Sequence, residues 1–410
     1  MTSQATGLRK QITAVLTLGC ALLAVTVSSS AWAQRVDSTV AIGQSNHVWS
    51  KTLQEERHIL VSLPQRYAQS NERYPVLYLL DAETQFHHTT GIVQFLASNG
   101  RIPEMIVIAV ANTNRVRDLT PPSTTAKLKK DAPDAGGADK FLTFLADELA
   151  PWVNANYRTE PYRILAGHSL GGLFAVHTLI HRPDTFQAYL AVSPSLWWDE
   201  RASVQDAKAR MAAIPAGNRY LRLTWGDNEN VIRDSTAELI EWLNKNPTPG
   251  VQWTQRYYAG DDHGTTPHRS HYDGLEELFA KWRPVFEIDD VKQNWDLAAV
   301  EAHYAKLSQQ YGYKIKPAAE AIDTIASQME ERKEYAAALE LRRRNLRDYP
   351  WLADVHAQLG NTLVHLNRLE EARREYDQAL QLQLELDNTY GDPIEGYRRN
   401  LKKISDAGKR

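Results

Sequence analysis

Short, almost continuous apolar runs recur between residues 50 and 285 and alternate with longer stretches whose apolar positions follow helical spacing. Runs that are apolar at nearly every position are typical of strands buried on both faces of a sheet. The predicted strands are 76–80, 105–110, 163–167, 188–192, 220–225 and 251–258. The predicted helices are 139–153, the stretch that follows Ser169, 234–244 and 271–282.

This alternation predicts an α/β fold, because strands separated by helices form crossovers in a mostly parallel sheet covered on both faces. Residues 52–64 predict one added antiparallel strand near the start. The segment 111–138 is longer than the ~12–15 residues of an ordinary structureless connection, so we expect it to be functional or mobile. It follows a strand, which places it at the carboxyl edge of the sheet, where ligands bind in such folds.

The pattern changes after Pro284, where the chain becomes almost entirely helical and rich in Ala, Leu, Glu and Arg. A shift of 34 residues aligns Ala326 with Gly360, Tyr335 with Leu369, Ala338 with Ala372, and Leu346 with Leu380. This period resembles tetratricopeptide repeats. Only two units are clear, so ordinary helical hairpins remain the alternative, and helices at 294–311 and 393–405 would serve as caps. The sequence thus predicts an α/β domain at 45–285 and a small all-α helical-repeat domain at 290–405.

The first 33 residues have the pattern of a secretory signal peptide. Arg9 and Lys10 precede an apolar run at 12–27, and Ala31-Trp32-Ala33 provides a small-residue cleavage site. An uncleaved membrane anchor is the alternative, but the run is short for a span of ~20 residues. We therefore expect a secreted, periplasmic protein with no membrane span after cleavage.

Cysteine content and charge exclude several classes of function. Cys20 is the only cysteine and lies in the predicted leader, so the rest of the chain has no cysteine nucleophile, disulfide or thiolate metal site. The net charge of −3 gives no support for binding to nucleic acid. No dinucleotide or phosphate-loop motif is present, and no cofactor is expected.

The segment Gly167-His168-Ser169-Leu170-Gly171 lies between a predicted strand and a predicted helix. In that context the pattern predicts a nucleophile elbow, a sharp turn that exposes a serine hydroxyl. The flanking glycines give the following helix room to pack closely. The amide of Leu170, at the start of that helix, is placed to stabilise a developing oxyanion.

A serine hydroxyl needs a base to take its proton, and in this fold the partners follow in the order serine, acid, histidine. The loop after the last predicted strand contains His263, followed in the chain by His268 and His271. His263 is preferred because it comes first after the strand. The preceding strand is followed by Asp227 and Glu229, and Glu229 is preferred only modestly as the acid.

Five separated motifs together resemble the putative esterase family of α/β-hydrolases. They are ERYPVLYLLDAETQF (72–86), NRVRDLTPP (114–122), GHSLGG (167–172), SPSLWWD (193–199) and DHGTTPHRSHYDGLEELF (262–279). The resemblance implies an α/β-hydrolase fold, Ser169 as nucleophile and His263 as base. It also implies that the amide of Ala82 or Glu83 completes the oxyanion hole. The family includes siderophore esterases, relatives of esterase D, feruloyl esterases and mycolyltransferases, and some members carry a carboxyl-terminal helical region.

Other residues are candidates for substrate contact. Trp197 and Trp198 follow a strand end and have the shape to stack on a planar group, although packing beneath the segment 111–138 is an equal alternative. Arg115 and Arg117 are candidates for binding an anionic substrate, but pairing of Arg117 with a neighbouring carboxylate is favoured.

The adjacent pair His87 and His88 lacks the spacing of a metal motif, so no metal site is expected. The sequence therefore predicts a secreted serine carboxylic-ester hydrolase acting on siderophore or other acyl esters, with a protein partner for the repeats. An acyltransferase on the same fold, or an inert hydrolase domain that serves as a binding module, are the alternatives.

Overall fold

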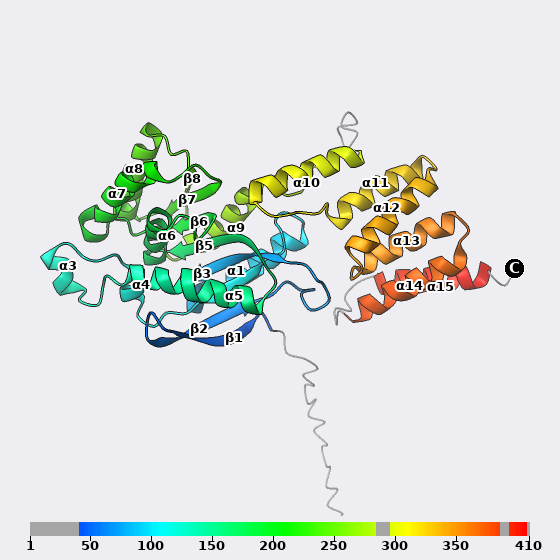
Figure 1. Ribbon diagram of the computed structural model, residues 1–410, viewed down its shortest axis with the longest axis horizontal. Helices are drawn as coiled ribbons and strands as arrows, with labels where there is room; N and C mark the ends of the chain where they lie inside the picture. The colour runs from blue at the N-terminus through cyan, green and yellow to red at the C-terminus, as the bar shows by residue number, and fades with distance from the viewer. Residues whose placement is uncertain (1–40, 284–295, 386–392, 408–410) are drawn as a thin grey trace, which may run out of the picture. The chain divides into compact units, whose positions relative to one another are not determined.

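The computed structural model describes residues 41–283, 296–385 and 393–407, so the predicted leader at 1–33 lies outside the described residues. Its centre is an eight-stranded sheet in the order β1-β2-β4-β3-β5-β6-β7-β8 (Figure 1). The strands are β1 (Gln44–Ser50), β2 (Glu55–Ser62), β3 (Tyr74–Leu80), β4 (Ile106–Val110), β5 (Thr159–His168), β6 (Ala188–Val192), β7 (Arg219–Gly226) and β8 (Val251–Tyr258).

The sheet is antiparallel at one edge and parallel elsewhere. Strand β2 runs antiparallel to both β1 and β4, and every other neighbouring pair is parallel. All six apolar runs predicted as strands are strands. The antiparallel strand predicted within 52–64 is confirmed as β2. Strand β1, which pairs with it through a turn at 51–54, was not predicted.

Each face of the sheet has its own hydrophobic core. Val76, Tyr78 and Leu80 of β3 belong to one core, and Leu77 and Leu79 belong to the other, because successive strand side chains point to opposite faces. The first core is covered by α4 (Ala138–Thr143), α5 (Ala150–Asn156), α6 (Leu170–His181), α7 (Trp198–Arg210) and α8 (Asn230–Lys245), and the second by α1 (Ala82–Ser98) and α9 (Thr266–Leu278). This two-sided burial confirms the predicted α/β-hydrolase architecture.

Three helical features differ from the sequence-based prediction. The helix predicted at 139–153 is α4 and α5 joined by a π-helical turn at Phe144–Leu149. Helices α1 and α7 were not predicted. The segment 111–138 is not structureless, because it contains α2 (Arg115–Leu119) and α3 (Ala126–Asp131).

The remainder of the described chain is all helical, as predicted. It consists of α10 (Leu297–Tyr311), α11 (Ala319–Glu331), α12 (Tyr335–Asp348), α13 (Ala353–His365), α14 (Leu369–Leu384) and α15 (Pro393–Ala407). The first residues of α11 and α13 are 319 and 353, and those of α12 and α14 are 335 and 369, which preserves the 34-residue period. A Cβ added at Gly360 would lie 3.0 Å from the ring of Tyr376, so α13 and α14 pack closely at this small residue. Their assignment as tetratricopeptide repeats stays a prediction.

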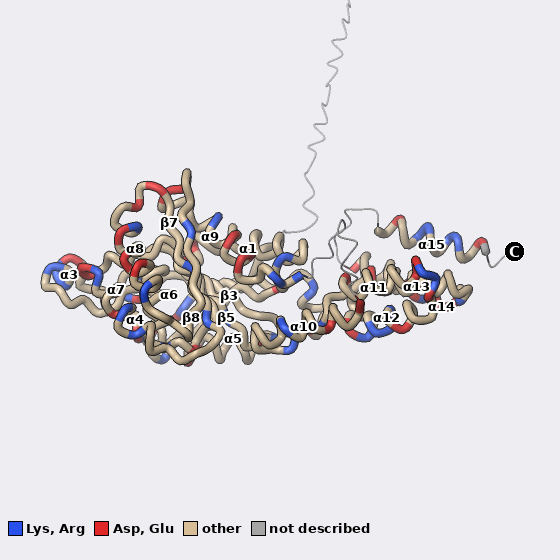
Figure 2. Tube along the Cα trace, turned by 90° about the horizontal axis from the view of Figure 1, so that it is seen from above, with Lys and Arg blue, Asp and Glu red and all other residues tan. Residues whose placement is uncertain are grey.

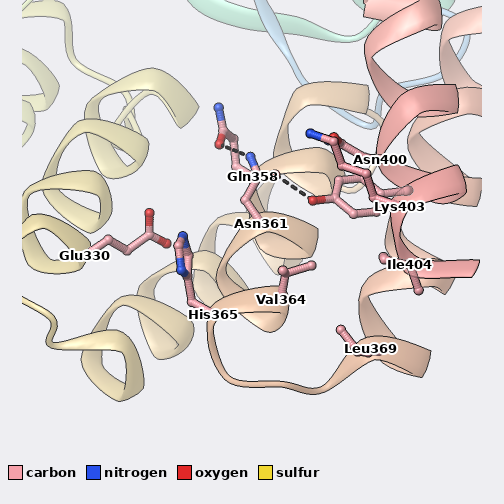
Figure 3. A pocket seen from close by; sticks show the side chains of 10 residues that line it. Glu330, Gln358, Asn361, Val364, His365, Leu369, Asn400, Lys403 and Ile404 are labelled. Carbon is pink, nitrogen blue, oxygen red and sulfur yellow. Dashed lines mark hydrogen bonds between the residues drawn. The ribbon is translucent and has the colours of Figure 1, made fainter. Parts of the chain in front are cut away.

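A cavity of about 520 Å³ lies among the helices α11, α13, α14 and α15. Its lining is mixed, with Asn361, Asn400 and Lys403 beside Val364 and Ile404 (Figure 3). None of the predicted catalytic residues lines this cavity.

Acidic and basic residues are interspersed along the described chain (Figure 2). No helix among the described residues combines the length and the apolar character needed to cross a membrane.

Candidate active site

Ser169 lies in a sharp turn between β5 and α6. Its backbone has φ 61° and ψ −114°, a left-handed conformation that costs a non-glycine residue free energy. The turn is held by the Ser169 amide, which donates to Val192 O at 2.9 Å. A Cβ at Gly167 would lie 2.3 Å from Gly171 O, and one at Gly172 would lie 2.9 Å from Val192 O. Only glycine allows the backbones to approach this closely, so the glycines of the motif build the elbow.

Two helices begin beside this turn. Leu170 is the first residue of α6, and Ala82 is the first residue of α1. Strands β3 and β5 are parallel neighbours, with Leu79 opposite Ala166, so both helices start at the same edge of the sheet. Amides in the first turn of a helix lack an acceptor within that helix and favour negative charge. Both helices thus present first-turn amides at the same ends of neighbouring strands. The carboxylate of Glu83 accepts from the Asn112 amide at 2.6 Å.

The loop after β8 and the loop after β7 bring His263 and Glu229 together. His263 Nδ1 lies 2.5 Å from Glu229 Oε1. The other carboxylate oxygen, Oε2, accepts from the Gly226 amide at 2.6 Å and from the Ser193 hydroxyl at 3.0 Å. Burial alone would raise the pKa of Glu229, but these three hydrogen bonds outweigh it and hold the pKa below its ordinary value. Glu229 is therefore a buried carboxylate whose hydrogen bond fixes the orientation of the His263 ring.

Asp227, the alternative acid, faces a different set of partners. Its carboxylate accepts from the Tyr257 hydroxyl and from the Gly260 amide at 2.8 Å. It is partly exposed, and these two hydrogen bonds lower its pKa. The structure thus pairs Glu229, and not Asp227, with His263.

His263 also lies next to the elbow. Its ring centroid is 4.4 Å from that of His168, the residue before Ser169. Ser169 Oγ is 3.3 Å from Ser195 Oγ and, within the described residues, makes no hydrogen bond to His263. Catalytic hydrogen bonds are often long or unmade before substrate binds. The nucleophile, the base and the acid candidates thus meet at one edge of the sheet.

Ser193 and Ser195 were not identified as candidates from the sequence. Both are buried, Ser193 has φ 43°, and each contacts one end of the site, Glu229 and Ser169 respectively. The signal was available in the motif SPSLWWD, where two serines flank a proline directly after a buried strand.

Arg115, in the segment that follows β4, makes hydrogen bonds that stabilise the turn at Ser169. Its guanidinium donates twice to the buried carboxylate of Asp81, at 2.6 and 2.9 Å, and once to His168 O at 3.0 Å. The Asp81 carboxylate also accepts from the Asn112 side chain at 2.8 Å. These contacts tie the end of β3 and the segment after β4 to the turn that carries Ser169.

Arg117, the residue proposed from sequence for an anionic substrate, is already in ion pairs. Its guanidinium donates to Asp118 Oδ1 at 2.7 Å and to both carboxylate oxygens of Glu55, at 2.6 and 3.0 Å. Asp118 is buried and also binds the buried Arg57 at 2.5 Å. The geometry places Arg117 in a network that anchors the segment 111–138 to β2.

The two tryptophans lie in different environments. Trp197 is 39% exposed, whereas Trp198 is buried in the first core. The next residue, Asp199, accepts from the amides of Thr124 and Thr125 at 2.5 and 3.1 Å. Trp197 is therefore the tryptophan that a ligand can contact. Hydrogen bonds to Asp199 hold the following residues to the segment 111–138.

A second group of histidines lies near His263 in the fold, and its members contact one another. His271, one of the alternative bases, is fully buried, and its Nδ1 lies 2.9 Å from the Thr89 hydroxyl. Its ring stacks on His88 at 5.5 Å, and His88 lies 5.4 Å from His268. Burial lowers the pKa of His168 to about 4 and lowers that of His271 well below the ordinary 6.5. Both rings are therefore neutral at neutral pH.

We expect the free energy of unfolding to fall as pH decreases from about 6.5 toward about 4. His168 and His271 take up a proton readily in the unfolded chain but resist it when folded, so each favours the folded state above pH 6.5. Each contributes a slope of up to about 1.4 kcal/mol per pH unit in that range. Urea unfolding at a series of pH values measures the slope, and His271→Asn should reduce it. A free energy that stays constant or rises on acidification through this range would contradict the expectation.

Comparison with known proteins identifies the family of this chain. The family model described as "Putative esterase" matches residues 50–286. The ferri-bacillibactin esterase BesA of Bacillus subtilis is 28% identical over 231 residues, which are 50% of this chain and 78% of that protein. The siderophore enterobactin esterase of Emericella nidulans is 38% identical over 137 residues, which are 30% of this chain and 45% of that protein.

Among solved structures, an IroE-like serine hydrolase from Shewanella oneidensis is 31% identical, with a TM-score of 0.64. The similarity covers 71% of this chain and 95% of that protein. The family match extends over more than half of the 410 residues. The chain therefore belongs to the Putative esterase family and is an esterase of the α/β-hydrolase fold.

Proposed function

We propose that this protein is a serine carboxylic-ester hydrolase in which Ser169, His263 and Glu229 form the catalytic triad. The observation that carries the proposal is the Glu229–His263 hydrogen bond of 2.5 Å, beside the residue that precedes the strained Ser169. A buried carboxylate bound to Nδ1 leaves Nε2 of the same ring as the base.

The reaction follows from these positions. His263 Nε2 accepts the proton of the Ser169 hydroxyl as Oγ forms a bond to the ester carbonyl carbon. The carbonyl oxygen becomes an oxyanion, stabilised by the amides of Leu170 and of Ala82 or Glu83. His263 returns the proton to the leaving alcohol. Water, deprotonated by the same imidazole, then attacks the acyl carbon of the acyl-enzyme. The bond from that carbon to Ser169 Oγ breaks, His263 returns the proton to Oγ, and the carboxylic acid is released.

Siderophore esters are the substrate class that we propose. Support comes from the names of the relatives, which are esterases of ferri-bacillibactin and of enterobactin. The half-exposed Trp197 offers a surface on which a planar aromatic acyl group can stack. The test is a comparison of ferric catecholate siderophores with simple chromogenic acyl esters under the same conditions. A kcat/KM for the siderophores no higher than for the simple esters would contradict the substrate assignment while leaving the esterase mechanism intact.

Glu229→Gln is expected to lower kcat by about 10⁴-fold. The amide can donate a hydrogen bond to His263 Nδ1, which favours the tautomer with the proton on Nε2, and that tautomer cannot act as the base. Asp227→Asn provides the matched control, since the same chemical change is made two residues away on a carboxylate that binds Tyr257 and Gly260 instead of His263. We expect less than about a threefold effect from it. Equal losses in the two variants, measured with a chromogenic ester, would rule out the specific role of Glu229.

Secretion to the periplasm and the binding of a protein partner by the helices α10–α15 complete the proposal. They are supported by the leader pattern at 1–33 and by the 34-residue spacing of the helix pairs. Fractionation of cells that express the full chain, followed by amino-terminal sequencing, tests the first. Processing after Ala33 is the expected result.

A further inference from the structure

Two histidines and two carboxylates gather at the end of α6 remote from Ser169. His177 and His181 are one helical turn apart on α6, and Asp139 comes from α4 and Asp206 from α7. His177 Nε2 lies 2.8 Å from Asp139 Oδ1, and His181 Nε2 lies 2.7 Å from Asp206 Oδ2. None of these four residues takes part in the proposed triad or oxyanion hole.

The spacing of these groups fits a single metal ion. One ligand atom from each of Asp139, His177 and His181 lies within 4.8 Å of the others, and the two imidazole centroids are 4.1 Å apart. Ligands of a tetrahedral zinc at bond lengths of 2.0–2.1 Å are about 3.3 Å from one another. Small side-chain rotations therefore suffice to bring the three atoms to coordination distance.

The surroundings also favour a cation. His181 is the last residue of α6, and the carboxyl end of a helix carries partial negative charge. The side chain of His177 is only 5% exposed, whereas those of His181 and Asp139 are 25% and 65% exposed, so an ion can enter from solvent. Arg210 binds the outer oxygen of Asp206 at 2.6 Å and leaves the oxygen beside His181 directed at the cluster.

We propose that Asp139, His177 and His181 bind a divalent first-row transition metal ion, with Asp206 or water as the fourth ligand. Two imidazoles and a carboxylate are a donor set that suits zinc and its neighbours. The bound ion would link α4, which begins where the segment 111–138 ends, to the helix that begins at the nucleophile. About 18 Å of helix separates His181 from Ser169 at 1.5 Å per residue, so the ion is structural and takes no part in hydrolysis.

Zinc binding by the untagged full chain tests this proposal by isothermal titration calorimetry. We expect one zinc per chain, with the affinity reduced at least about tenfold in His181→Gln and in Asp139→Asn. His47→Gln is the matched control, because His47 lies 3.0 Å from Glu56 in a surface pair and, among the residues that the structure describes, belongs to no such group of three. It should bind zinc as the wild type does. No saturable binding, or equal affinity in all four proteins, would overturn the site.

Thermal unfolding gives a second measurement that does not depend on calorimetry. Zinc at a hundredfold excess over its dissociation constant should raise the midpoint of the wild type by about 5 °C and leave that of His181→Gln unchanged. Circular dichroism at the same time shows whether each variant is folded. Equal shifts in the wild type and in a folded His181→Gln would assign the zinc to another place and overturn the proposal.

Discussion

Ser169→Ala is expected to reduce kcat for ester hydrolysis by about 10⁶-fold, the loss typical when the nucleophile of a serine hydrolase is removed. The methyl group keeps the volume of the side chain but has no oxygen to form the acyl-enzyme. Initial rates with a chromogenic acyl ester measure the change, and circular dichroism verifies that the variant is folded.

Ser195→Ala is the matched control for that result. Ser195 is the buried neighbour whose Oγ lies 3.3 Å from Ser169 Oγ, and its loss removes a hydroxyl from the same site. We expect a reduction of about tenfold or less, because it supplies neither the bond to the acyl carbon nor the proton transfer. If Ser195→Ala were inactive and Ser169→Ala fully active, the nucleophile would have been assigned to the wrong serine.

His263→Ala is expected to have an effect of similar size, about 10⁶-fold on kcat, because the nucleophile and its base act as a unit. KM should change little, since the imidazole acts in the chemical steps. The double variant with Ser169→Ala should be no slower than either single variant. An additive loss would contradict the joint action of these two residues.

His268→Ala separates the base from the other histidines of the same region. His268 is exposed and lies five positions later, at the start of α9. Its removal should leave kcat within about threefold of the wild type. If His268→Ala were inactive and His263→Ala active, the role of the base would have to be assigned to His268.

The elbow could be predicted from local sequence because its chemistry is local. The turn needs glycines where Gly171 O and Val192 O come close to the backbone. These glycines, the serine between them and the flanking apolar runs all lie within fourteen residues. The acid could not be chosen as firmly. Asp227 and Glu229 are two residues apart in a turn where Asn228 has φ 59°. The direction in which each carboxylate leaves such a turn is set by backbone conformation, which no periodicity records.

The elements that were missed have weak apolar patterns. Strand β1 is an edge strand, and only two of its seven residues, Val48 and Ser50, are buried. Helix α1 contains Thr89, Thr90 and Gly91, which are poor helix formers. Helix α7 is mostly polar, so its few buried positions do not form a clear stripe. Each of these elements is stabilised by packing against residues that are distant in the sequence, so its own residues give little sign of it.

The histidine pair at one end of α6 was overlooked for a related reason. His177 and His181 are separated by Thr-Leu-Ile, so they lack the glutamate of the His-Glu-x-x-His zinc motif. Asp139 comes 38 positions before His177 and joins it only because α4 packs against α6. A cluster whose residues come from separate helices can be recognised only once the fold is known.

Mass spectrometry of the protein after reaction with a fluorophosphonate tests the central claim most directly. Such reagents bond covalently to a serine oxygen only when a base has activated it. One adduct per chain on the peptide that contains Ser169, formed far more slowly in His263→Ala, is the expected result. An unlabelled folded protein, or an adduct on a different serine, would contradict the account.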